Sequence, residues 1–120
     1  MVKVCFVGDA ISKTNVHSDI AFIGAKCFPT LVKWIKILDP DYYIVLNSNS
    51  SKDHFKIEKL HEDGFKIITL GNKADAKIRK YTYITDAYRI EHPSGLNRNL
   101  NNKSYVDKML KECKTYIEEI

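Results

Sequence analysis

The sequence predicts an α/β fold, with three α/β/α layers built on a central, mostly parallel, four-stranded sheet. Four short apolar segments alternate with patterns typical of amphipathic helices, and this alternation favours parallel strands with helices on both faces. The chain has 120 residues, of which 44% are hydrophobic and 28% are charged. That length fits one domain, and that composition favours a packed core over disorder. We therefore expect residues 1–120 to form a single compact domain.

Three of the predicted strands are strong because they are rich in Val, Ile, Tyr and Phe, as buried strands are. They are VKVCFV before Gly8, DYYIVLN ending at Asn47 and FKIITL before Gly71. The fourth strand, YRIEH before Pro93, has a weaker pattern. The segment YTYIT at residues 81–85 fits either a further strand or a loop.

Helix signals lie between these strands. Pro29 suits the first turn of a helix, and the Asp-Pro pair at residues 39–40 stops it. The apolar face of this helix consists of Leu31, Val32, Ile35 and Leu38. Ser51 can cap a second helix that runs through His61, and Gly64 suits its C-terminal exit.

Two further helices are expected in the second half of the chain. Residues 73–80 can form a short helix after the third strand. The C-terminal segment places apolar side chains on one stripe. These are Val106, Met109, Leu110, Cys113, Ile117 and Ile120. Ser104 and Asp107 resemble a capping box at the start of this helix, with Asp in place of Glu.

Cysteine content and charge restrict the class of protein. Cys5, Cys27 and Cys113 are far apart and form no CxxC motif, so we expect core thiols rather than a metal site or a disulfide framework. No apolar stretch approaches the roughly 18 residues of a membrane span, which predicts no membrane partner and a cytoplasmic location. The net charge of +4 and the pI near 8.9 fit a polyanionic partner and fit an ordinary solvated surface equally well.

All four predicted strands lead into polar segments. In open parallel sheets, ligands bind beyond the carboxyl ends of the strands. The four segments that follow the strands are GDAISKTN at residues 8–15, NSNSS at 47–51, GNKAD at 71–75 and HPSGLNR at 92–98. Their convergence on one edge predicts a binding site there.

These four segments, in this order, resemble the uracil-DNA glycosylase superfamily. GDA at residues 8–10 is similar to the Gly-Glu-Ala motif after the first strand of the thermophile-type branch, and AFIGAKCFPTLVKWI at 21–35 is similar to its PFVGRAGQLL segment. YIVLNSNS at 43–50 resembles the strand that ends in a base-reading Asn. The last two motifs are LGNKA at 70–74, which resembles a Gly-Lys-Ala turn, and HPSGLNR, which resembles both His-Pro-Ser and the NPSGL of the mismatch-specific branch.

The chain departs from the family pattern in its first motif and in its length. Ile11 stands where the family usually has Pro, and Asp9 replaces Glu. The iron–sulfur cysteines of the thermophile-type branch are missing, and the chain is much shorter than typical members. These departures keep open an alternative, a catalytically inactive domain that binds DNA or a nucleotide or docks onto a partner.

The resemblance implies two catalytic residues. His92 would donate a hydrogen bond to a carbonyl oxygen of the leaving uracil, where negative charge develops. Asp9 would orient or activate the attacking water. Each has a structural alternative, because a lone His is commonly a structural hydrogen-bonding residue and an Asp after a strand commonly caps a turn.

The resemblance also implies a base pocket. Asn47 carries both a donor and an acceptor, as one edge of a pyrimidine requires. Phe22 would stack on the extruded base, and Asn15 would line the pocket. Alternatively, Asn47 ends the strand in a turn and Phe22 belongs to the core.

A DNA contact surface follows from the last motif. Leu96 would fill the gap that a flipped base leaves in the duplex, or it folds back onto its own domain. Pro93 and Gly95 would shape the turn that carries it. The remaining residues implied to contact DNA are Ser12, Lys13, Lys73, Ser94, Asn97 and Arg98. Lys73 equally suits a solvated helix start.

The expected function is therefore the excision of uracil or a related modified pyrimidine from single- or double-stranded DNA, without a metal or cofactor. A nucleoside or nucleotide hydrolase on the same scaffold is a third hypothesis, because fold does not dictate function. A repair or replication protein is an expected further partner. The Lys, Asn and Ile content suggests an AT-rich source and the compactness a viral or mobile-element gene, so the expected location is DNA-associated, in a cell or a virus-infected host.

Overall fold

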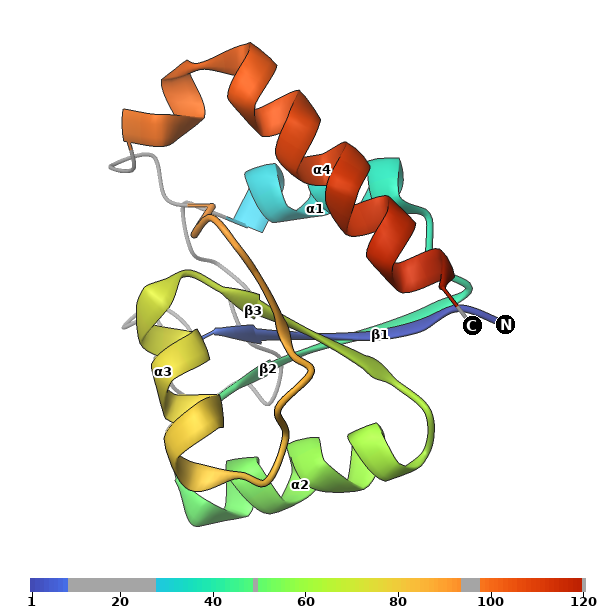
Figure 1. The fold of residues 1–120 in the computed structure, drawn as a ribbon, viewed down its shortest axis with the longest axis vertical. Helices are drawn as coiled ribbons and strands as arrows, with labels where there is room; N and C mark the ends of the chain where they lie inside the picture. The colour runs from blue at the N-terminus through green and yellow to red at the C-terminus, as the bar shows by residue number, and fades with distance from the viewer. Residues whose placement is uncertain (9–27, 49, 94–97, 120) are drawn as a thin grey trace.

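The computed structural model describes residues 1–8, 28–48, 50–93 and 98–119 (Figure 1). Its centre is a four-stranded sheet in the order β2-β1-β3-β4, in which all described pairings are parallel. The strands are β1 (Lys3–Gly8), β2 (Tyr42–Asn47), β3 (Lys66–Leu70) and β4 (Tyr88–Ile90). The predicted fourth strand is thus the shortest, and the predicted parallel sheet is confirmed.

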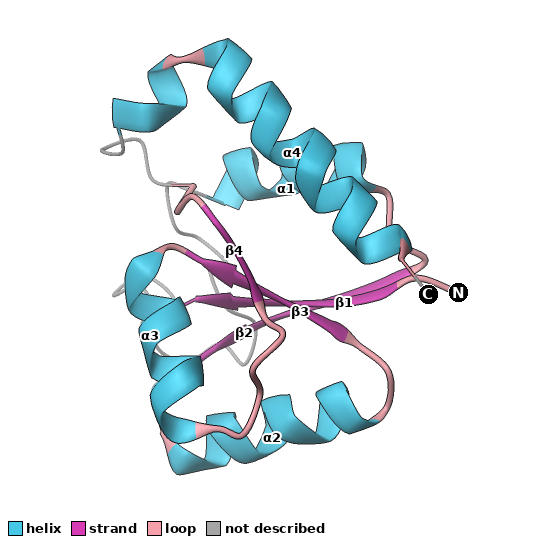
Figure 2. Cartoon of the chain, in the orientation of Figure 1, coloured by secondary structure: helices cyan, strands magenta, loops and turns pink. Residues whose placement is uncertain are grey.

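Helices cover both faces of the sheet. α1 (Phe28–Leu38) and α4 (Lys103–Glu118) lie on one face, while α2 (Ser51–Glu62) and α3 (Asn72–Tyr81) lie on the other (Figure 2). Side chains of β1 alternate between two core clusters: Val4 and Phe6 pack on the α1/α4 side, and Cys5 and Val7 pack on the α2/α3 side. The predicted three-layer α/β/α architecture is confirmed.

The register of the sheet aligns the carboxyl ends of its strands. Gly8 at the end of β1 pairs with Asn47 at the end of β2. On the other side, Leu70 pairs with Ile90, and the amide of Gly71 donates to the carbonyl of Ile90 at 2.8 Å. In the order β2-β1-β3-β4 the connections change direction between β1 and β3, and open α/β sheets bind ligands at such a point.

Local signals explain most of the helix ends. α1 stops at Leu38, as the Asp-Pro pair predicts, and Asp39 adopts a left-handed φ of 49° before Pro40. α2 starts after Ser50, one residue before the predicted cap, and the Ser50 hydroxyl accepts from the amide of Asp53 in a capping box. Trp34, which was not assigned to the apolar face of α1, is buried in the core.

The predicted capping box of α4 is wrong. Asn102 is the cap, and its side-chain oxygen accepts from the amide of Tyr105 at 3.1 Å. Because the short 3-10 helix η2 (Arg98–Asn101) leads straight into α4, Ser104 already lies within the first turn. The predicted stripe is buried at Met109, Leu110, Cys113 and Ile117 and half-buried at Val106, and Ile120 lies outside the described residues.

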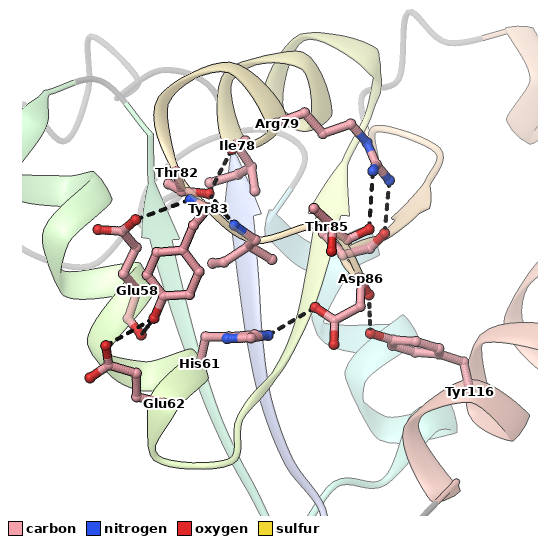
Figure 3. A network of polar contacts seen from close by, with 12 residues as sticks. Glu58, His61, Glu62, Ile78, Arg79, Thr82, Tyr83, Thr85, Asp86 and Tyr116 are labelled. Atoms are coloured by element: carbon pink, nitrogen blue, oxygen red, sulfur yellow. Dashed lines mark hydrogen bonds and ion pairs between the residues drawn. The ribbon is translucent and has the colours of Figure 1, made fainter.

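The YTYIT segment is not a strand. Tyr81 ends α3, and the chain from 82 to 87 runs as a turn and loop into β4. Polar contacts from three helices hold this loop (Figure 3). His61 bonds the Asp86 carboxylate at 2.8 Å, the Tyr116 hydroxyl donates to the Asp86 carbonyl, and Arg79 donates to two further loop carbonyls. These contacts link α2, α3 and α4 to the loop that precedes β4.

Cys5 and Cys113 are buried and unpaired, as expected of core thiols. Burial raises the pKa of each thiol to about 12. Cys27 lies outside the described residues. Among the helices that the structure describes, none is long and apolar enough to cross a membrane.

Candidate functional site

Asn47 lies at the carboxyl edge of the sheet, at the end of β2. Its side chain is only 9% exposed, and Oδ1 has no hydrogen-bond partner among the described residues. Leaving such a group buried and unpaired costs about 1–3 kcal/mol. Strand alternation puts Asn47 on the α1/α4 side, as Val45 is. A ligand that donates a hydrogen bond at this point would remove the penalty.

Ser48 fixes the end of β2 against the end of β1. Both its amide and its hydroxyl donate to the carbonyl of Gly8, each at 2.9 Å. The residue is 1% exposed, so this link is shielded from water. The position of Asn47 is therefore set by the sheet rather than by a free loop.

Gly71 and His92 are in close contact on the other side of the same edge. Gly71 has a φ of +93°, and a Cβ built on it would lie 3.1 Å from Cβ of His92. Only glycine satisfies both conditions without strain. The half-buried His92 is thereby held against the backbone turn between β3 and α3.

The N-terminus of α3 adds positive electrostatic character near His92. Gly71 is its N-cap and provides no side-chain cap, so the first amides of the helix lack an intrahelical partner. Lys73 is exposed on this first turn. Asp75 is engaged elsewhere, since it accepts from the Thr69 hydroxyl at 2.9 Å and pairs with Arg79 at 2.9 Å. This arrangement favours negative charge on a ligand near His92.

The structure brings three of the predicted site residues, Asn47, Lys73 and His92, to one edge of the sheet. Arg98 is exposed and begins η2, after the loop that follows β4. The other predicted site residues lie outside the described part of the chain: Asp9, Ser12, Lys13, Asn15, Phe22, Ser94, Gly95, Leu96 and Asn97. Within the described ranges, no group of three or more His, Cys, Asp and Glu side chains is placed to hold a metal ion.

Two features of this edge were not predicted from the sequence. The contact between Gly71 and His92 joins residues 21 positions apart, and the sequence offered only one local hint of it, a glycine directly after a predicted strand. His54 is buried, and its Nε2 also lacks a partner among the described residues. It lies on a helix with a low apolar content, where the sequence gave no reason to single it out.

Comparison of the chain with protein-family models, curated proteins and solved structures found no match.

Proposed function

We propose that the protein is a DNA glycosylase that flips out uracil or a related modified pyrimidine and hydrolyses its N-glycosidic bond. The observation that carries this proposal is the buried Oδ1 of Asn47, which has no partner among the described residues and lies at the same sheet edge as His92. The motif resemblance supports the same assignment.

The chemistry of Asn47 suits uracil. The N3–H of uracil is a donor that would satisfy Oδ1, and the neighbouring O4 would accept from the amide nitrogen of the same side chain. Cytosine has an acceptor at N3, which would leave Oδ1 facing another lone pair. Selection against cytosine then follows from the cost of the unsatisfied acceptor.

His92 and the start of α3 suit the leaving group. As the bond between C1′ and N1 breaks, the base takes the electron pair and becomes an anion. A donor from His92 to a uracil oxygen would stabilise that charge, and the helix N-terminus behind it would add a favourable field. The contact with Gly71 keeps His92 in place without a reorganisation during the reaction.

Water is the proposed nucleophile. Its oxygen forms a bond to C1′ as the base departs, and its proton passes to a carboxylate. The motif resemblance assigns this role to Asp9, which directly follows Gly8 in the sequence and itself lies outside the described residues. The resemblance assigns the contacts with DNA to Leu96, Arg98 and the other residues that the sequence analysis implies contact DNA.

The test is strand cleavage at a single uracil in single- and double-stranded oligonucleotides after alkali treatment. We expect a nick with the natural protein, and a loss of about 10²-fold or more in Asn47→Ala and His92→Ala. His61→Ala is the matched control. His61 lies in the last turn of α2, where its ring contacts the Asp86 carboxylate, and it is not part of this sheet edge. It should retain excision.

Two results would contradict the proposal: full activity in both edge variants, or no nick with a folded protein. Salt-dependent DNA binding without an abasic product would instead support the inactive binding domain. All proteins need to come from cells that lack their own uracil glycosylase.

A further inference from the structure

A pocket lies near the candidate site, between the start of α2 and the later turns of α3. Its volume is about 400 Å³, which is in the range of small-molecule sites. The described residues that line it are Ser48, Ser50, Ser51, His54, Lys77 and Tyr81. No carboxylate is among these described lining residues, whereas hydroxyls and cationic or ring nitrogens are frequent.

The N-terminus of α2 lies at this pocket, which Ser50, Ser51 and His54 line. Ser50 Oγ accepts from the amide of Asp53, and the Ser50 carbonyl accepts from the amide of His54. The helix begins at Ser51, so the amides of Ser51 and Lys52 have no intrahelical partner. Two backbone donors at the positive end of a twelve-residue helix suit an anion.

His54 is the second, independent sign of a ligand. It is 91% buried, since its exposure is 9%, and its Nε2 has no hydrogen-bond partner among the described residues. Its ring stacks on Tyr81 with the ring centres 5.2 Å apart and the planes 17° apart, and both rings line the pocket. A buried ring nitrogen without a partner is costly unless a ligand or water engages it.

Two lysines contribute positive charge at this pocket. Lys77 lines it, and Nζ of Lys80 lies 5.2 Å from the ring centre of Tyr81. The nearest acid on α2, Asp53, accepts from the Ser50 amide in the capping box. Hydroxyls, free helix amides, a histidine and lysines together are the donor set that recognises phosphate.

We infer that this pocket binds the phosphate of a nucleotide, with room in the remaining volume for part of the attached sugar. The favoured source is a nucleic-acid strand that leaves the candidate base site. Ser48 directly follows Asn47, and their side chains project to opposite faces at the end of the edge strand β2. A strand that wraps this end would place a neighbouring phosphate at the pocket. Only this choice of source rests on the proposed function.

Ser51→Pro tests the free amide directly. Ser51 is the first helical residue, where proline is favoured, and Ser50 before it has φ −140° and ψ 166°, which proline also permits. The substitution removes the amide donor and keeps the helix. Ser51→Ala is the matched control, because it removes the same hydroxyl and retains the amide.

The readout is the fluorescence anisotropy of a labelled oligothymidylate without uracil. We expect Ser51→Pro to weaken binding about tenfold relative to Ser51→Ala, as the loss of one hydrogen bond to a charged group predicts. Lys77→Gln should weaken binding. It should also reduce the magnitude of the slope of log binding constant against log salt concentration by about 0.7. Lys108→Gln on α4, whose side chain is 79% exposed, should change neither.

Thymidine monophosphate and inorganic phosphate separate the two sources. Weak binding of both, with tight and Ser51→Pro-sensitive binding of the oligonucleotide, supports the strand. Equally tight, equally sensitive binding of the monophosphate supports the phosphate pocket and overturns the strand as its source. Equal affinity of Ser51→Pro and Ser51→Ala for every probe overturns the pocket itself.

The experiment also separates this inference from the proposed function. Repeating the Ser51 comparison in an Asn47→Ala background removes the base contact and leaves the pocket intact. If the Ser51→Pro effect persists while no uracil is excised by the natural protein, the glycosylase proposal fails and the phosphate pocket stands. If uracil is excised but the two Ser51 variants bind alike, the phosphate pocket fails and the glycosylase proposal stands.

Discussion

At the scale of single residues, the molecule keeps two buried polar atoms unpaired among its described residues, Oδ1 of Asn47 and Nε2 of His54. Both belong to the regions for which we propose ligands. Buried polar groups without partners are rare in native proteins because each one lowers stability. Their presence fits our proposal that these positions serve binding at some expense of stability.

Asn47→Leu should separate these two roles. Leucine has a similar size and no polar atom, so we expect the free energy of unfolding to rise by about 1 kcal/mol while excision is lost. Thr69→Val is the control, because Thr69 is fully buried and its hydroxyl donates to Asp75. That variant should lose about 1–2 kcal/mol. Urea denaturation measures both, and a marked loss of stability in Asn47→Leu would show that its amide is structurally satisfied.

The contact between Gly71 and His92 gives a second prediction. Gly71→Ala should lower the free energy of unfolding by about 1–3 kcal/mol, through its positive φ and the close contact, and should also reduce excision. Gly64→Ala provides the comparison, since Gly64 has the same φ of +93°. Among the described residues, the atoms nearest to a Cβ at Gly64 belong to the flexible end of Lys3, at 3.7 Å and beyond. It should lose stability and retain excision. Equal excision in the two variants would mean that Gly71 does not position His92.

At the scale of elements, the sequence predicted the four strands and four α-helices of the described residues better than their ends, and it did not predict the 3-10 helix η2. Pro29 and the Asp-Pro pair marked α1 well because proline acts locally. Neighbouring candidates for a cap, such as Ser50 beside Ser51 and Asn102 beside Ser104, could not be ranked from sequence, because the start of a helix also depends on how the preceding chain packs. The same reason limited the site: Asn47 follows from its place at a strand end, whereas the His92–Gly71 contact and the burial of His54 depend on distances across the fold.

The cap of α4 is a direct test at this scale. Asn102→Ala should lower the free energy of unfolding by about 1 kcal/mol, because it removes the acceptor for the amide of Tyr105. Ser104→Ala should have little effect or slightly stabilise, since alanine is the better helix former within a first turn. Thermal denaturation of the two variants compares them. A larger loss in Ser104→Ala would restore the cap that the sequence suggested.

At the scale of the whole molecule, stability should decline in alkaline solution. Burial raises the pKa of Cys5, Cys113 and Tyr116 to about 12, from ordinary values of 9 for cysteine and 10 for tyrosine. Between the ordinary and the raised pKa, the unfolded chain releases protons that the folded chain retains. The free energy of unfolding is therefore unaffected by these groups below about pH 9 and falls as the pH rises from there towards 12.

Tyr116→Phe should make that decline shallower above pH 10, because one of the three groups no longer ionises. At neutral pH the variant should be less stable than the natural protein, since it loses the hydrogen bond to the Asp86 carbonyl. Urea denaturation at intervals between pH 7 and pH 11 measures both effects. Identical slopes in the two proteins would show that Tyr116 ionises alike in the folded and unfolded chains.

The reactivity of the two buried thiols can report local opening of the fold. The Cys5 side chain of β1 packs between the sheet and the α2/α3 layer, and Cys113 of α4 packs between the sheet and the α1/α4 layer. A thiol-specific reagent can therefore reach each thiol only when the helices that cover it separate from the sheet. In a Cys27→Ser background, the labelling rate of each position would time the opening of one layer independently of the other. Equal labelling rates would mean that the two helical layers open as one cooperative unit. Unequal labelling rates would identify the helical layer that opens more readily.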